Sequence, residues 1–130
     1  MDVIGREALL QAFAEAWTAR DLGGLMELMA QDCEFGASVG PGPGASFVGR
    51  EQVRRGYELF LGRPGGPVPE TTMAPTLVNE AFAVTRWTSR WVGPDGAPVE
   101  VQACDVFEFE GDRIKRKDTY RKVGGELPPG

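Results

Sequence analysis

One carboxylate in this sequence stands in an apolar setting where it could do acid–base chemistry. From Val99 to Glu110 alternate residues form an apolar set in which Asp105 carries the only charge (Val99, Val101, Ala103, Asp105, Phe107 and Phe109). Alternate residues of a strand share one face, so this set predicts a buried sheet face. Desolvation raises the pKa of a buried carboxyl unless a partner stabilises its charged form. We therefore predict that Asp105 is a general acid or base, with structural anchoring as the alternative.

The basic segment from Arg113 to Lys122 carries two more groups that could do chemistry. Alternation favours an inward face made of Ile114, Arg116, Asp118, Tyr120 and Lys122, with the intervening residues, including Lys117 and Thr119, facing outward. This arrangement directs Asp118 and Tyr120 toward Asp105. Tyr120 is then a candidate donor to an enolate oxygen, and Asp118 is a second candidate carboxylate whose simpler interpretation is an ion pair.

The segment from Phe82 to Val92 has two faces that periodicity does not separate. One face presents Trp87 and Trp91, whose rings would stack on a flat ligand or form part of a dimer interface. The other face presents Arg86 and Arg90, which would need carboxylate partners if they were buried. Both arrangements stay open at this stage.

The residue counts exclude several classes of chemistry. The chain has 130 residues, no histidine and two cysteines, Cys33 and Cys104, so Ser-His-Asp and Cys-His mechanisms are excluded and zinc or iron–sulfur sites lack ligands. We expect no metal. The net charge of -5 argues against a nucleic-acid partner. The N-terminal residues do not resemble a signal peptide and no apolar run could span a bilayer, so we expect a cytoplasmic protein with reduced thiols and no membrane partner.

Helices are expected first and strands afterwards. Helical spacing of apolar residues predicts helices from Glu7 to Arg20, from Asp21 to about Gln31 or Asp32, and from Arg50 to Leu61. A short strand is expected from Cys33 to Ala37. Period-two patterns predict strands at Thr71–Val78, Phe82–Val92, Val99–Glu110 and Arg113–Lys122, the last three joined as an antiparallel meander.

Glycine and proline mark the connections between these elements. The segment from Gly36 to Gly49 reads as a loop that could act as a lid, because it lacks the spacing of a phosphate-binding motif. A second loop is expected from Gly62 to Pro69. We predict one α+β domain over residues 1–123, with helices packed on one face of a curved, mostly antiparallel sheet, and a flexible tail over residues 124–130.

Four stretches of the chain resemble the nuclear-transport-factor-2-like superfamily, and within it the SnoaL-like proteins of the polyketide-cyclase type. The stretches are Leu9–Leu22, Met29–Phe35, Phe47–Val53, and Cys104–Phe109 running into Arg113-Ile114. The resemblance implies a cone-shaped α+β barrel with a pocket between sheet and helices, no cofactor, and often a homodimer packed through the sheet. The superfamily contains isomerases, epoxide hydrolases, dehydratases, cyclases and non-catalytic members.

The resemblance also carries over to single residues. Asp105 matches the oxyanion-hole aspartate of ketosteroid isomerases and the acid–base aspartate of the cyclases, whereas Phe13 and Ala37 stand where the isomerases have their tyrosine and catalytic base. Against the epoxide hydrolases, Asp118 matches one aspartate and Arg86 the arginine. Their second aspartate falls on Thr88. This sequence therefore lacks part of the catalytic residue set of the ketosteroid isomerases and part of that of the epoxide hydrolases.

The favoured hypothesis is a cofactor-independent cyclase or isomerase acting on a hydrophobic, carbonyl-bearing small molecule. Asp105 would be the acid–base group, with Tyr120 and an arginine stabilising an enolate oxygen. The alternatives are a non-catalytic ligand-binding or dimerisation module and, less favoured, an epoxide hydrolase using Asp118. The residues expected to contact the ligand are Phe13, Trp17, Met29, Phe35, Tyr57, Phe60, Arg86, Trp87, Trp91 and Phe107.

Overall fold

Two of the three described helices begin at an aspartate cap, and the third ends at a glycine. In the computed structural model, which describes residues 2–62 and 68–130, the helices are α1 (Val3–Thr18), α2 (Leu22–Glu27) and α3 (Arg50–Leu61). The Asp2 carboxylate accepts the backbone N–H of Gly5 at the start of α1, and Asp21 caps α2 in the same way. These caps satisfy N–H groups that have no partner within a helix. Gly62, with φ of 76°, ends α3.

The strands form one mixed, curved sheet that is not closed into a barrel. Among the described residues seven strands take part: β1 (Met29–Gly36), β2 (Ser46–Val48), β3 (Glu70–Met73), β4 (Leu77–Val78), β5 (Phe82–Val92), β6 (Pro98–Glu110) and β7 (Arg113–Arg121). Their order is β2-β1-β7-β6-β5-β3, and β4 pairs separately with β5. All these pairs are antiparallel except β1 with β7. The predicted meander of the last three strands is confirmed.

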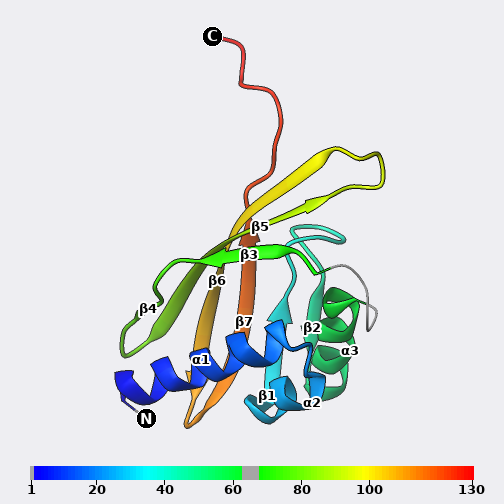
Figure 1. Ribbon diagram of the computed structural model, residues 1–130. Coiled ribbons are helices and arrows are strands. Elements are labelled where there is room, and N and C mark those ends of the chain that lie inside the picture. The colour runs from blue at the N-terminus through cyan, green and yellow to red at the C-terminus, as the bar shows by residue number, and fades with distance from the viewer. Residues whose placement is uncertain (1, 63–67) are drawn as a thin grey trace.

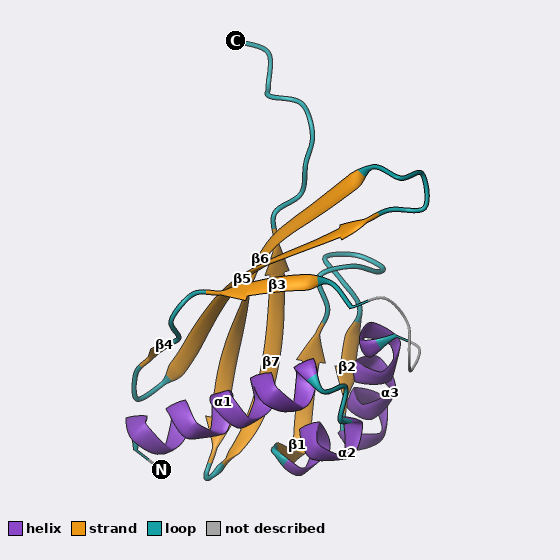
Figure 2. Cartoon of the chain, viewed as in Figure 1, coloured by secondary structure: helices purple, strands orange, loops and turns teal. Residues whose placement is uncertain are grey.

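The helices lie on one side of this sheet, as Figures 1 and 2 show. We call the side that packs against α1 and α3 the inner face and the opposite side the outer face. The β5–β6 hairpin extends beyond the helices at one end, and the C-terminal segment leaves the body from that end (Figure 1). Residues 122–130 are exposed and have no regular secondary structure. The expected α+β architecture is therefore confirmed, with an open curved sheet.

The core lies between the inner face and the helices. Its largest fully buried side chains are Tyr57 from α3, Leu25 from α2, Met29 from β1 and Ile114 from β7. Residues from all three helices and from four strands meet in this single cluster, so helices and sheet stabilise one another by burying the same apolar surface.

No described helix is long and apolar enough to cross a membrane.

Several predicted element bounds needed correction: α1 runs from Val3 to Thr18 and not from Glu7 to Arg20, and β1 begins at Met29 and not at Cys33. The second helix ends at Glu27, not near Gln31 or Asp32, because Met29 already begins β1 and pairs with Ile114. The predicted loop from Gly36 to Gly49 contains β2, which pairs with β1. The strand expected from Thr71 to Val78 is interrupted around Pro75, which has no backbone N–H to donate to a neighbouring strand. Most of the loop predicted from Gly62 to Pro69 lies outside the described residues.

Candidate functional site

Asp105 lies on the inner face of β6 and accepts hydrogen bonds from both neighbouring strands. Its side chain is 11% exposed. The Thr119 hydroxyl of β7 donates to Oδ1 at 2.6 Å, and the indole N–H of Trp87 on β5 donates to Oδ2 at 3.1 Å. Residues directly opposite in an antiparallel pair share a face, and Thr119 stands opposite Asp105. The carboxylate is therefore held in place by strands on both sides.

Lys117 of β7 completes this site as the cationic partner of Asp105. Its Nζ atom lies 3.4 Å from Asp105 Oδ1 and donates to Thr119 Oγ1 at 3.0 Å. Only 7% of the Lys117 side chain is exposed. Burying two charges costs several kcal/mol per ion unless they are paired and hydrogen-bonded. The Asp105–Thr119–Lys117 triangle meets both conditions.

Aromatic rings enclose the ammonium group of Lys117. The Nζ atom lies 4.9 Å from the centroid of the Trp17 ring and 4.8 Å from that of Phe35. An ammonium at this distance is attracted by the negative face of a ring, and more strongly where water is excluded. The pair therefore stands at the edge of an aromatic cluster and not in a polar channel.

Most of the residues expected to contact a ligand belong to this aromatic cluster. Phe13 makes edge contacts with Phe107 and Tyr57, with centroids 5.5 and 5.9 Å apart, and Phe35 packs on Tyr57 at 4.9 Å. Trp17 packs on Tyr57, and Phe60, which is 40% exposed, touches Phe35. The structure thus brings Phe13, Trp17, Phe35, Tyr57, Phe60 and Phe107 together. Their role in binding stays a prediction.

Tyr57 is the polar member of this cluster. Its hydroxyl is buried and donates to the sulfur of Met29 at 3.4 Å. Burial raises the pKa of Tyr57 well above its usual value, with a smaller contribution from the negative charges of Cys33 and Asp105. The phenol is therefore a neutral donor across the neutral pH range.

The prediction that Asp118 and Tyr120 point toward Asp105 is wrong. Between β6 and β7 the register shifts: Glu108 pairs with Arg116, but Phe109 pairs with Ile114, which leaves Lys115 as an extra residue on β7. Such a bulge reverses the alternation of side chains beyond it. Ile114 faces inward before the bulge, and Lys117 and Thr119, not Asp118 and Tyr120, face inward after it.

On the outer face Asp118 and Tyr120 form a separate polar cluster. The Tyr120 hydroxyl donates to Asp118 Oδ2 at 3.0 Å, and Arg116 lies 3.3 Å from the same oxygen. Arg116 also lies 3.4 Å from Glu34 of β1. Tyr120 is 56% exposed, and its pKa is raised by the hydrogen bond to Asp118. The ion-pair interpretation of Asp118 describes this arrangement.

The two faces of β5 are now assigned. Trp87 stands opposite Ala103 and faces inward, whereas Arg86 stands opposite Cys104, is exposed and faces outward. The expectation that Arg86 lines an inner pocket is therefore wrong, and the epoxide-hydrolase alternative loses the inward arginine that it required. Trp91 lies on the same face of β5 as Trp87, four residues further along the strand, and is 38% exposed.

Sequence reasoning missed Lys117 and Thr119. Beyond Ile114 the strand consists of polar residues only, so no apolar pattern marks where the alternation reverses. A lysine on the inward face also runs against the usual exposure of that residue type. The signal that could have identified it is the unpaired inward carboxylate of Asp105, which demands a cationic partner from a neighbouring strand.

The cysteines and carboxylates do not form a metal site in the described part of the chain, where no group of three or more potential ligands gathers. Cys33 is buried and Cys104 is half-buried, and both are free. Burial raises the pKa of each thiol. These thiols are therefore poor nucleophiles at neutral pH.

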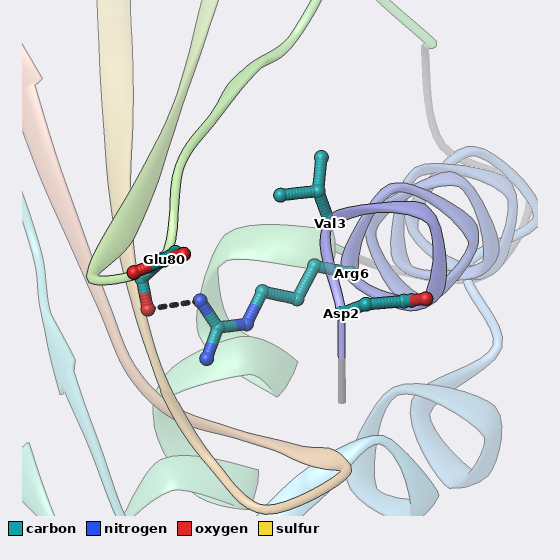
Figure 3. Close-up of a pocket in the computed structure, with 4 residues that line it drawn as sticks. All are labelled: Asp2, Val3, Arg6 and Glu80. Carbon is teal, nitrogen blue, oxygen red and sulfur yellow. Dashed lines mark hydrogen bonds between the residues drawn. The ribbon is translucent and has the colours of Figure 1, made fainter.

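A pocket of about 360 Å³ lies at the N-terminal end of α1, lined by Asp2, Val3, Arg6 and Glu80. Figure 3 shows Arg6 reaching from α1 to the turn before β5, where its guanidinium donates to the backbone carbonyl of Glu80. Arg6 also donates to the Asn79 carbonyl and lies over the Phe109 ring. This arginine ties the start of α1 to the sheet. None of the residues that line this pocket belongs to the Asp105 site.

Comparisons with known proteins show the family and the fold of the chain. The model of the SnoaL-like domain matches residues 10–117. The fold resembles that of an NTF2-like protein of unknown function from Mesorhizobium loti, with a TM-score of 0.75, 22% identity and 93% of each chain covered. The curated proteins contain no match.

Two further solved structures have names that mention an activity. A putative ketosteroid isomerase from Kribbella flavida has a TM-score of 0.69 and 15% identity, with 99% of this chain and 86% of that one covered. An LEH-like epoxide hydrolase from M. tuberculosis has a TM-score of 0.70 and 19% identity, with 92% and 84% covered. At these identities the likeness concerns the fold alone.

Proposed function

Because the chain belongs to the SnoaL-like domain family, we propose that it is a cofactor-independent enzyme of the cyclase or isomerase type. Its substrate would be a hydrophobic small molecule that carries a carbonyl group, as in a polyketide-like chain. Asp105 would be the general base that removes a proton from the carbon next to that carbonyl. The observation that carries this proposal is a carboxylate held by two hydrogen-bond donors and an ammonium group at the edge of an aromatic cluster.

The hydrogen bonds of Asp105 suggest which oxygen would take the proton. Oδ1 is engaged by Thr119 at 2.6 Å and by Lys117 at 3.4 Å, whereas Oδ2 has the single donor Trp87 at 3.1 Å. A carboxylate oxygen has two lone pairs, so Oδ2 keeps one acceptor position. Proton transfer by a positioned carboxylate typically contributes about 10²- to 10⁴-fold to a rate.

Lys117 takes the part that the sequence had assigned to Tyr120 and an arginine. An ammonium group beside the carbonyl oxygen stabilises the negative charge that develops there as the proton leaves. The aromatic rings around Lys117 would exclude water and strengthen this interaction. The neutral Tyr57 hydroxyl belongs to the same cluster but already has Met29 as its acceptor.

A ligand-binding module without catalysis is the second candidate. The observation that favours it is the same network: Thr119, Lys117 and Trp87 already satisfy Asp105 within the protein, as they would in a purely structural pair. In that case the aromatic cluster would hold an apolar ligand and leave it unchanged. A homodimer and a cytoplasmic location also remain predictions from the sequence.

Hydrogen–deuterium exchange tests the proposal without knowledge of the natural substrate. A panel of hydrophobic aryl and cyclic ketones is incubated with the protein in D₂O, and loss of the α-hydrogen signal is followed by NMR. We expect exchange with at least one ketone, and a decrease of roughly a hundredfold or more in Asp105→Asn. Glu108→Gln is the matched control, since it removes a carboxylate from the outer face of the same strand.

This assay distinguishes the enzyme from the ligand-binding module. Equal exchange by Asp105→Asn and by the unmodified protein would remove Asp105 from the chemistry. Ketones that quench tryptophan fluorescence in a saturable way, but exchange no hydrogen, would favour the binding module. Circular dichroism of each variant checks that a lost signal does not come from unfolding.

A further inference from the structure

Lys117 differs from the other lysines of the chain in its surroundings. The sequence contains three lysines, at positions 115, 117 and 122. Lys115 is 31% exposed in its side chain and forms an ion pair with Asp32, and Lys122 is exposed. Lys117 alone is buried, at 7% side-chain exposure, and its ammonium group lies 4.9 and 4.8 Å from the centroids of two aromatic rings. A primary amine in such a place is a candidate nucleophile.

We propose that Lys117 binds aldehydes or ketones covalently, as an imine on its Nζ atom. The class of ligand is an uncharged, apolar carbonyl compound, because the Asp105–Lys117 pair is already neutral as a whole and its surroundings are aromatic. This activity goes beyond proton abstraction by Asp105 and does not require it, since an imine can form on a carbonyl that has no α-hydrogen.

The contacts of Lys117 supply the proton transfers that imine formation needs. The ammonium must first lose a proton, and Asp105 Oδ1 lies 3.4 Å from Nζ, with Thr119 Oγ1 bridging the two groups at 3.0 and 2.6 Å. These contacts provide a direct route from Nζ to the carboxylate and a second route through the Thr119 hydroxyl. Asp105 is thus positioned as the proton carrier.

The bonds and charges balance through the sequence of steps. The Nζ lone pair attacks the carbonyl carbon and forms a C–N bond, while the π electrons move to oxygen. That oxygen takes the proton held by Asp105 and becomes a hydroxyl. The nitrogen then returns a proton to Asp105, which delivers it to the hydroxyl so that water leaves. The net change converts an ammonium and a carbonyl into a protonated imine and one water.

The product keeps the interactions that hold the free lysine. A protonated imine carries the same single positive charge at the same nitrogen, so the attraction to Asp105 and to the rings of Trp17 and Phe35 persists. Hydrolysis is slowed where water is excluded. The site is not sealed, since the side chains of Lys117 and Asp105 retain 7% and 11% of their exposure. An imine at Lys117 is therefore favoured over one at Lys122.

Reductive trapping tests the proposal on the unmodified protein. The protein is incubated with benzaldehyde and, separately, with a cyclic ketone, each in the presence of cyanoborohydride, which converts an imine into a stable secondary amine. Peptide mass spectrometry then locates the adduct among the three lysines and the N-terminal amine. We expect Lys117 to carry more adduct than Lys122 at short times. Adduct confined to Lys115, Lys122 and the N-terminus would overturn the proposal.

Three variants sharpen this experiment. Lys117→Arg keeps the positive charge but cannot form an imine, so loss of the dominant adduct is expected, whereas Lys122→Arg keeps it. Asp105→Asn removes the proton carrier, and labelling of Lys117 should slow by roughly a hundredfold. Labelling of Lys117 at an unchanged rate in Asp105→Asn would contradict the assigned proton path.

The trapping experiment and the exchange assay test the two proposals separately. Trapping of benzaldehyde, which has no α-hydrogen, reports on imine formation and not on the removal of an α-proton. If ketones exchange hydrogen but no adduct is trapped on Lys117, the proposed function stands and the imine proposal is overturned. If an adduct is trapped on Lys117 but no ketone exchanges hydrogen, the imine proposal stands and the proposed function is overturned.

Discussion

Substituting Lys117 by methionine tests whether the buried ion pair holds the site together. The change removes the ammonium but keeps an unbranched side chain of similar length, so little cavity is created. Asp105 then remains as a buried carboxylate with two hydrogen bonds, from Thr119 and Trp87, in place of a full set of partners. Removing one member of a buried pair typically costs about 3–5 kcal/mol.

The structure places the expected cost at the lower end of that range. The two remaining hydrogen bonds retain part of the stabilisation of Asp105, and contacts of a methionine sulfur with Trp17 and Phe35 offset part of the lost cation–ring attraction. We expect a loss of about 3 kcal/mol in the free energy of unfolding. For a domain of this length that corresponds to a decrease in Tm of about 11 °C.

Urea denaturation and thermal melting measure this loss, with Lys122→Met as the control. Lys122 is exposed, so its substitution should change the stability by no more than about 0.5 kcal/mol. The double variant Lys117→Met with Asp105→Asn should recover most of the loss, since no unpaired charge is then buried. Equal stabilities of Lys117→Met and Lys122→Met would refute the argument that the pair is buried and coupled.

Three further predictions concern the core, the outer face and α2. Burial raises the pKa of Tyr57 well above its usual value, so the folded protein holds this proton longer than the unfolded chain, and stability should fall as the pH rises above about 10. Alkaline denaturation midpoints check this, and Tyr57→Phe should flatten the loss. A Cβ on Gly36 would clash with the Asp118 carboxylate and turn it away from Arg116 and Tyr120, so Gly36→Ala should destabilise the fold by about 1 kcal/mol, and adding Asp118→Gly should recover part of this in urea melts. Gly23→Ala in α2, whose Cβ meets nothing closer than 3.8 Å, should instead stabilise by about 0.4–1 kcal/mol.

The helices and the last three strands could be predicted because their signals are local. The apolar spacing of α1 and α3 and the alternation in β5 and β6 lie within single segments, and the turns at residues 93–97 and 111–112 join neighbours in sequence. The elements that failed depend on distant partners. Met29 is a strand residue because β7 lies beside it, and the backbone N–H of Ile114 donates to the carbonyl of Leu28. Nothing within residues 21–32 carries that information.

The candidate site also contains residues that the sequence could identify and residues that it could not. Asp105 and the aromatic residues on α1, α3, β1 and β6 were identifiable, because a charge inside an apolar alternation and rings at helical spacing are visible in one segment. The partners of Asp105 were not. Trp87 belonged to a strand with two equivalent faces, and the sequence assigned Lys117 and Thr119 to the wrong side of theirs.

The sequence by itself determined that one carboxylate would face an aromatic core without a histidine or metal ligand set to assist it, since residue types and alternation decide both points. Only the tertiary structure decided which groups meet that carboxylate. The physical reason is one extra residue, Lys115, in the pairing of β7 with β6. Because side chains alternate along a strand, a single-residue bulge turns Lys117 and Thr119 inward and Asp118 and Tyr120 outward. The bulge arises from the pairing of whole strands, and no residue pattern within β7 marks it.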